Sequence, residues 1–324
     1  MEPFVTLDEI KAARERIKSA ARYTPLIDVP YPPATSSDIR LRLKCENLQP
    51  MGAFKIRGAF NMIAQLPKES LERGVITYSS GNHGQAVAMA AQKLGAPAVI
   101  VMPTTAPQVK IDGCKSYGAE VIMEGTTSLD RQKRAEQEAG ARGLTIVPPF
   151  DHKQIIIGQG TMGLEILEQC PEVGTVIVPV GGGGMASGVA AAIKLSKPDV
   201  RIVAVEPAGA PKMSKSLAAG HPITLPSSKS IADGLMNLRP GDITFAHIRA
   251  FVDEVVMVSE EDIAANVAWL FRNARLVVEP SGAVTTAAVA LGLGNVDKSK
   301  GPVVAVVSGG NVAPEAFAKY VTVA

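Results

Sequence analysis

The stretch TVIVPVGGGGMASGVAAAIK, residues 175–194, contains a strand, a turn and a helix in direct succession. Its first six residues are almost wholly apolar, as expected of a strand buried on both faces of a parallel sheet. Gly181, Gly182, Gly183 and Gly184 have no Cβ, so successive backbone N–H groups can converge on an anion at the start of the next helix. The run is neither GxGxxG nor a Walker A loop, so it indicates a phosphate site but neither NAD binding nor ATP hydrolysis.

The same alternation of short apolar runs and longer helical patterns extends along most of the chain. The other runs are VITYS (75–79), AVIVMP (98–103), EVIMEG (120–125), TIVPPF (145–150), RIVAVEP (201–207), EVVMVS (254–259) and VVAVVSG (303–309). Helical patterns between them include 128–142 and 262–274, the second introduced by a cap signature at Ser259. This order predicts an α/β fold with helices on both sides of its sheets.

Several local expectations follow from the first third of the chain. A capping box at Thr6 begins a first helix that Thr24-Pro25 ends. Residues 31–38 form a loop, and residues 40–46, RLRLKCE, alternate like a strand with one wet face. We expect a small α/β domain at 73–151, inserted into a large domain made of 1–72 and 152–324.

Composition excludes several classes of protein. The chain has 324 residues, 46% hydrophobic and 20% charged, with a formal net charge of +2, which predicts no nucleic-acid or membrane partner. Cys45, Cys114 and Cys170 form neither a zinc pattern nor a disulfide framework, and the four histidines are scattered. The simplest location is cytoplasmic.

Three polar turns also stand out. SSGNHGQ (79–85) and SGGN (308–311) each follow an apolar run, and EPSG (279–282) opens a helical pattern. Because ligands of parallel sheets bind at the carboxyl ends of strands, these turns and the glycine run can form one pocket. The pocket would offer backbone N–H groups for a phosphate and polar side chains that can form hydrogen bonds. At residues 79–85 it would also offer backbone N–H groups and hydroxyls for a carboxylate.

One lysine decides what that pocket holds. In QPMGAFKIRG, residues 49–58, Lys55 lies between Phe54 and Ile56. It is either a solvated lysine at a helix start or an amine held in an apolar wall to form a Schiff base. The ligand that carries both a phosphate and an aldehyde is pyridoxal 5′-phosphate, which favours the second interpretation.

These motifs, in this order, resemble the serine/threonine dehydratase and serine racemase family. The resemblance rests on KCENLQ (44–49), FKIRGA (54–59), SSGNHGQA, GGGGM, EPSGA and SGGN, and extends from Thr24 to Asn311. It implies a fold-type II pyridoxal-phosphate enzyme, similar to the tryptophan synthase β subunit, with two open, twisted, mostly parallel sheets flanked by helices.

The resemblance also implies roles for individual residues. Lys55 would carry the cofactor, beside Phe54, and act as the Cα base; Asn82 would bond the ring hydroxyl and Ser308 the pyridine nitrogen. The other implied cofactor contacts are Gly181, Gly182, Gly183, Gly184, Met185, Glu279 and Gly309. The implied substrate contacts are Ser79, Ser80, Gly81, Asn82, His83, Arg131, Asp233 and Gly234.

The implied reaction is β-elimination of water from L-threonine and L-serine, giving a 2-oxo acid and ammonia. Alternatives are a dehydratase for threo-3-hydroxyaspartate or phenylserine, or mainly a serine racemase. Cysteine synthase and threonine synthase fit less well, because their motifs around the lysine and the asparagine turn differ. A non-catalytic binding protein on the same scaffold is the remote alternative.

Two positions depart from parts of the family. Ser80 is alanine in many threonine dehydratases but serine in the racemases, so it either adds racemase activity as a second acid/base or only binds carboxylate. At Lys212, relatives that bind a divalent cation have an acidic residue. We predict that the Lys212 ammonium pairs with Glu206 and that no divalent metal is needed.

Two further expectations come from the family alone. The chain ends at Ala324, soon after SGGN, so a regulatory domain and feedback by isoleucine are not expected. A homodimer is expected from the resemblance and not from any surface patch in the sequence.

Overall fold

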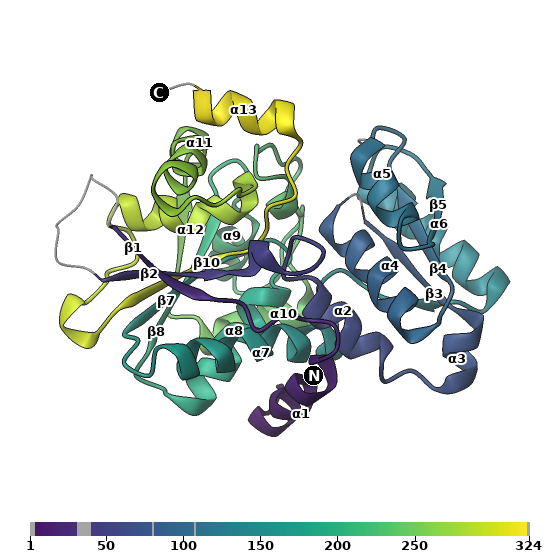
Figure 1. Cartoon of the computed structure of the whole chain (residues 1–324), viewed down its shortest axis with the longest axis horizontal. Helices are drawn as coiled ribbons and strands as arrows, with labels where there is room; N and C mark the ends of the chain where they lie inside the picture. Colours follow the sequence, from purple (N-terminus) through teal and green to yellow (C-terminus); the bar gives the residue numbers. More distant parts are fainter. Residues whose placement is uncertain (1–3, 31–39, 80, 107, 323–324) are drawn as a thin grey trace.

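The structure, a computed structural model, describes residues 4–30, 40–79, 81–106 and 108–322 (Figure 1). The strands are β1 Leu26–Val29, β2 Leu41–Cys45, β3 Val75–Tyr78, β4 Ala98–Met102, β5 Glu120–Met123, β6 Thr145–Ile146, β7 Thr175–Pro179, β8 Arg201–Pro207, β9 Glu254–Val258 and β10 Val303–Val307. They form a six-stranded sheet in the order β1-β2-β10-β7-β8-β9 and a four-stranded sheet in the order β5-β4-β3-β6. Except for the antiparallel β1–β2 pair, neighbouring strands are parallel.

The α-helices are α1 Leu7–Ile17, α2 Ile56–Ile63, α3 Lys68–Arg73, α4 Asn82–Leu94, α5 Gln108–Lys115, α6 Ser128–Arg142, α7 Lys153–Gln169, α8 Gly184–Ser196, α9 Lys212–Ala219, α10 Asp242–Phe251, α11 Glu260–Trp269, α12 Pro280–Ala290 and α13 Pro314–Thr322. Short helical turns are η1 Glu46–Leu48, η2 Asp233–Leu235, the π-helical η3 Leu270–Ala274 and η4 Lys298–Lys300. Helices thus alternate with strands, as the sequence predicts.

The six-stranded sheet is buried on both faces. Along β10, Val303, Ala305 and Val307 pack with α11 and α12, whereas Val304 and Val306 pack with α7, α8 and α10. This alternation is what a period-2 strand between two helical layers requires. The fold class expected from the sequence, two mostly parallel sheets flanked by helices, is confirmed.

The four-stranded sheet lies beside the larger one, on the right in Figure 1. Its strands come from residues 75–146, with α4 on one face and α6 on the other. Helix α2 packs against α4 and also against α7, which flanks the larger sheet. The domain boundaries at 73 and 151 stay a prediction.

Some local expectations need correction. The first helix begins after the Thr6 capping box but ends at Ile17, well before Thr24. Lys44 in β2 does not face water, because it is fully buried against carboxylate and carbonyl partners. The run at 145–150 supplies a strand of only two residues, and the loop expected at 31–38 lies outside the described residues.

The predicted helix at 128–142 is confirmed, and the one at 262–274 begins at Glu260 and becomes a π-helix at Leu270. Within the described ranges, no helix is both long and apolar enough to cross a membrane. In the same residues, no three His, Cys, Asp or Glu side chains gather to hold a metal ion.

Candidate active site

Lys55 is the residue immediately before α2, and its amine reaches the chain segment that follows β6. Ile56 is fully buried, Phe54 is half-buried, and the Lys55 Nζ lies 5.2 Å from the centre of the Phe54 ring. Nζ donates a hydrogen bond to the backbone oxygen of Pro149 at 2.7 Å. Among the described residues no carboxylate pairs with this amine. Burial therefore lowers the pKa of Lys55 to about 8.

The chain before Lys55 is bound to the end of β10. Ala53 and Gly309 form an antiparallel bridge, and the Phe54 N–H donates to the Ser308 oxygen at 3.1 Å. The Gly310 N–H donates to the Gly52 oxygen at 2.9 Å. These contacts hold the predicted cofactor residues Ser308 and Gly309 against the backbone that carries Lys55.

The glycine run lies where the sequence predicts it, between β7 and the start of α8. Gly183 has φ +106°, a conformation that favours glycine, and a Cβ there would lie 2.7 Å from Cβ of Thr244. A Cβ on Gly182 would overlap the ring of Phe150. N–H groups of the first turn of a helix have no partner within the helix, so this turn can bind an anion.

Residues 149–151 connect the glycine run to Lys55. Pro149 accepts the Lys55 hydrogen bond, and Phe150 packs on Gly182 and Gly184. The Asp151 carboxylate accepts from the first N–H groups of α10 at 3.0–3.1 Å. One short segment therefore places the amine and the anion-binding turn side by side.

Asn82, the first residue of α4, belongs to a buried polar cluster. Its amide donates to Oε1 of Glu279 at 2.7 Å, and its oxygen accepts from Nδ2 of Asn311 at 2.9 Å. Glu279 precedes α12 and is almost fully buried. Burial, reinforced by the charge of Asp233, raises the pKa of Glu279 to about 8, so it is mostly protonated at neutral pH.

The implied substrate contacts Asp233 and Gly234 lie in η2. Gly234 N–H donates to Oγ of Ser281 at 2.9 Å, and the Ser281 backbone oxygen in turn accepts from Ser308 Oγ at 3.3 Å. Asp233 forms an ion pair with Lys110 of α5 at 2.7 Å, which connects the regions of the two sheets. Gly234 therefore joins the same cluster as Ser308, and Asp233 precedes it in the chain.

The predicted substrate residues of the stretch 79–85 follow β3, and His83 belongs to the first turn of α4. His83 is buried, and its Nε2 donates to the Val147 oxygen at 3.0 Å, which leaves Nδ1 without a partner in the described part of the chain. Burial and then the Lys55 charge lower the pKa of His83 to about 3, so it is neutral. Ser79 Oγ accepts from Gly81 N–H at 3.3 Å. Ser80 lies outside the described residues.

Arg131 is not brought to Lys55 by any contact among the described residues. It lies in α6, where Nη1 contacts the Thr126 oxygen at 3.4 Å and Nε has no described partner. Burial lowers the pKa of Arg131. Its expected role over the substrate therefore stays a prediction.

Sequence reasoning missed two functional groups. The Pro149 backbone oxygen carries no signal in the sequence, because any residue has one. Asn311, which donates to both Asn82 and the Met51 oxygen at 2.9 Å, lies in the SGGN turn that the sequence singles out, so the turn chemistry could have indicated it.

Glu206 and Lys212 lie behind the glycine run and are both fully buried. Lys212 Nζ lies 3.4 Å from Glu206 Oε2 and donates to the backbone oxygens of Val180 at 3.0 Å, Ala210 at 3.1 Å and Leu235 at 3.0 Å. Burial lowers the pKa of Lys212 while Glu206 opposes that shift. An ammonium group is thus surrounded by four oxygens.

The residues fit pyridoxal phosphate. The glycine turn has room only for backbone beside Phe150 and Thr244, which suits a phosphate bound by N–H groups. Lys55 offers an amine of lowered pKa with no carboxylate partner among the described residues. Met185 lies in the first turn of α8, and Asn82 bonds Glu279, so both remain candidates to contact the cofactor together with Ser308.

Comparison with known proteins agrees with this chemistry. The chain is 43% identical to "L-threonine ammonia-lyase" of Thermotoga maritima over 95% of its own length and 76% of that protein. It is 43% identical to "Serine racemase" of Oryza sativa subsp. indica, over 87% of this chain and 83% of that one. The structure of maize serine racemase superposes with a TM-score of 0.91 at 39% identity, covering 98% of this chain and 97% of that one.

The family model described as "Pyridoxal-phosphate dependent enzyme" matches residues 17–309, from the end of α1 to the Ser308–Gly309 turn. The match includes Lys55, the glycine run and the Asn82–Glu279 cluster, which the structure brings together. The chain belongs to the pyridoxal-phosphate dependent enzyme family.

Proposed function

We propose that this protein eliminates water from L-threonine and L-serine, releasing a 2-oxo acid and ammonia with pyridoxal phosphate as cofactor. The observation that carries the proposal is the Lys55 amine, which lies beside the segment that packs on the glycine run and, within the described part of the chain, has no carboxylate partner. Relatives named L-threonine ammonia-lyase and L-threonine dehydratase, 41–43% identical over 95% of the chain, support the substrate class.

When bound, pyridoxal phosphate withdraws electrons from the Cα of an attached amino acid and so makes its proton removable. Lys55 is the chain's base for that proton, since burial lowers its pKa towards the neutral range where general bases work best. The glycine run and Met185 bind the phosphate, and Asn82, Glu279, Ser308 and Gly309 hold the ring. Ser79, Gly81, His83, Arg131, Asp233 and Gly234 are the proposed substrate contacts.

The test is 2-oxo acid release from L-serine, L-threonine, L-threo-3-hydroxyaspartate and phenylserine by the reconstituted enzyme, measured in parallel. Preference for serine or threonine is the expected result. Preference for either other substrate would keep the chemistry and change the substrate. No turnover of any of them would refute the elimination.

Serine racemase is the second candidate, because a named racemase is as similar in sequence as the ammonia-lyases. We propose a side racemase activity through Ser80. Ser80→Ala is expected to abolish D-serine formation and to spare 2-oxo acid release, measured by chiral chromatography and by a coupled dehydrogenase assay. Equal loss of both products would show that Ser80 only binds the carboxylate.

We propose that no divalent metal is required, because the Lys212 ammonium already contacts Glu206 and three backbone oxygens beside the glycine run. Wild-type activity is expected to survive exhaustive chelation. Lys212→Met leaves the Glu206 carboxylate buried without its cation, so its activity and melting temperature are expected to fall and to recover partly with added potassium or ammonium ions. Lys215→Met, an exposed lysine on the same helix, is the matched control. A magnesium or calcium requirement of the wild type would contradict the proposal.

A glycine substitution tests the phosphate site. Gly183→Ala places a Cβ 2.7 Å from Thr244 at φ +106°, and is expected to weaken cofactor binding by about tenfold or more. Gly95→Ala is the matched control, because Gly95 has φ +70° with no neighbour within 4 Å of a Cβ. Titration of the apoenzyme by absorbance measures both. Equal affinities in the two variants would contradict a phosphate site at residues 181–184.

A homodimer in the cytoplasm completes the proposal. The three cysteines are buried, free thiols, which suits a reducing compartment. The dimer rests on the family resemblance.

A further inference from the structure

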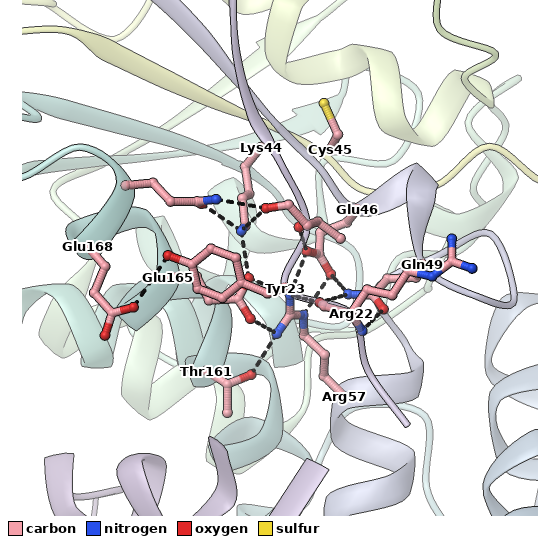
Figure 2. A network of polar contacts seen from close by, with 12 residues as sticks. Arg22, Tyr23, Lys44, Cys45, Glu46, Gln49, Arg57, Thr161, Glu165 and Glu168 are labelled. Carbon is pink, nitrogen blue, oxygen red and sulfur yellow. Dashed lines mark hydrogen bonds and ion pairs between the residues drawn. The ribbon is translucent and has the colours of Figure 1, made fainter. Parts of the chain in front are cut away.

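Two residues after Lys55, the fully buried Arg57 lies in a cage of charged and polar groups (Figure 2). Its guanidinium donates to both oxygens of Glu46, at 2.7 and 2.8 Å, and to both oxygens of Glu165, at 2.6 and 2.8 Å. It also donates to Thr161 Oγ1 at 3.1 Å and to the Arg22 oxygen at 3.2 Å. These bonds involve all three guanidinium nitrogens, so the group is fixed in one orientation.

Lys44 completes the cage. Its ammonium donates to Glu165 Oε2 at 2.6 Å, to the Thr24 oxygen at 2.8 Å and to Gln169 Oε1 at 2.8 Å. Two cations and two carboxylates therefore balance in a region that water does not reach. Although burial opposes it, the paired carboxylates raise the pKa of Arg57, and Arg57 overcomes the burial of Glu46 to lower the pKa of that carboxyl.

The cage joins four elements of the fold. Arg57 belongs to the first turn of α2, Lys44 and Glu46 to β2 and η1, and Thr161 and Glu165 to α7. Glu165 is 108 positions from Arg57 in the chain. The cage therefore fixes the start of α2 against both the edge region of the large sheet and the helix that covers it.

Stability alone does not explain such an arrangement. Buried ion pairs contribute little net free energy of folding, and well-packed apolar residues of the same volume are often as stable. A planar guanidinium held by two bidentate carboxylates does fix position, because a shift of α2 would lengthen several short bonds at once. The residues before Lys55 are bound separately, through Ala53 and Phe54, to the end of β10.

We propose that Arg57 is a positioning residue for Lys55: its cage fixes the first turn of α2 so that the amine points at the Pro149 oxygen, beside the glycine run. The inference rests on the proposed role of Lys55 in the reaction. Because the cage carries no net charge, Arg57 acts through geometry. Misplacing a reacting group by about 1 Å can cost a rate factor of roughly 100.

The test uses Arg57→Lys in the holoenzyme, which keeps the charge and much of the volume but loses the planar fork. We expect kcat to fall by about 10- to 100-fold with a smaller change in KM, at unchanged cofactor content. Arg14→Lys is the matched control, since it makes the same exchange at a partly exposed arginine of α1 that pairs with Glu168 of α7 outside the cage. We expect Arg14→Lys to leave kcat nearly unchanged.

A second readout needs neither cofactor nor activity. Pulse acetylation of the apo chain at a series of pH values, with mass spectrometry of the Lys55 peptide, reports the midpoint at which the amine becomes reactive. The wild type and Arg14→Lys are expected near pH 8. In Arg57→Lys, with Lys55 distinguished from the new lysine by fragmentation of the peptide, we expect a higher midpoint and a higher limiting rate above it, because a displaced amine regains water.

Two results would overturn the proposal. One is a wild-type kcat and wild-type Lys55 reactivity in Arg57→Lys; the other is an equal loss of kcat in Arg14→Lys. A failure of the proposed elimination can be distinguished from a failure of the positioning role of Arg57, because the acetylation profile of the apo chain does not depend on the reaction. If Arg57→Lys does not fold, Thr161→Val is the alternative variant, because it removes one neutral hydrogen bond to Arg57. It is expected to lower kcat by about twofold to tenfold. An unchanged kcat in Thr161→Val would overturn the proposal.

Discussion

Lys55→Ala is expected to reduce 2-oxo acid release by about 1,000-fold or more, since it removes the group that we propose as the base at Cα. The same substitution removes the amine that would bind the cofactor covalently, so the visible absorbance of a lysine-bound cofactor should be lost. No neighbouring group can replace it among the described residues: His83 is buried, neutral and bonded to the Val147 oxygen. The measurement is kcat/KM on L-threonine and L-serine, together with the absorption spectrum.

Two controls make the result specific. Lys93→Ala changes an exposed lysine on α4 and is expected to leave both rate and spectrum unchanged. Added methylamine should restore part of the Lys55→Ala rate, because a small amine can enter the space left by the side chain. Retention of more than a tenth of the wild-type rate without added amine would contradict the assignment of Lys55.

Glu165→Leu is expected to have the largest effect on stability, about 3–5 kcal/mol of the free energy of unfolding, because a buried ion pair loses one partner. Glu165 accepts short bonds from both Lys44 and Arg57, at 2.6 to 2.8 Å, and its side chain is only 5% exposed (Figure 2). Leucine leaves both cations buried with fewer acceptors. Urea unfolding of the apo chain, followed by circular dichroism, measures the change.

Glu168→Leu is the matched control for this prediction. Glu168 lies on the same helix α7, is about half exposed, and pairs with Arg14 at the surface. Surface pairs contribute about 0–1 kcal/mol, so a small change is expected. Similar losses in the two variants would mean that burial of the Arg57 cage adds nothing to its energetics.

Much of the fold was predictable because its elements have local signatures. The capping boxes at Thr6 and Ser259 begin helices as expected, and the apolar runs from 75 to 307 became strands. The helix end at Ile17 was missed, because the apolar pattern continues through Ala20, which is buried outside the helix. The length of the strand expected at 145–150 was overestimated, because the prolines at 148 and 149 cannot continue the backbone pairing of β6.

The candidate site was predictable where its chemistry is carried by residue type and local order. Lys55, the glycine run and the polar turns lie together, as expected from strand ends of parallel sheets. Contacts that depend on a backbone oxygen, such as Pro149 with Lys55, leave no trace in residue type. Arg131 is the opposite case. Its residue type and position suggest a substrate contact, but its described hydrogen bond is to the turn before α6.

The sequence by itself determined the order of strands and helices, the glycine turn at 181–184 that precedes α8, and the place of Lys55 just before α2. Each of these depends on neighbours within a few positions, through periodicity, caps and missing Cβ atoms. Only the tertiary structure decided that Lys44 and Arg57 are buried, although both belong to stretches that the sequence singles out. A charged side chain is buried only when partners neutralise it, and here Glu165 comes from more than a hundred positions away.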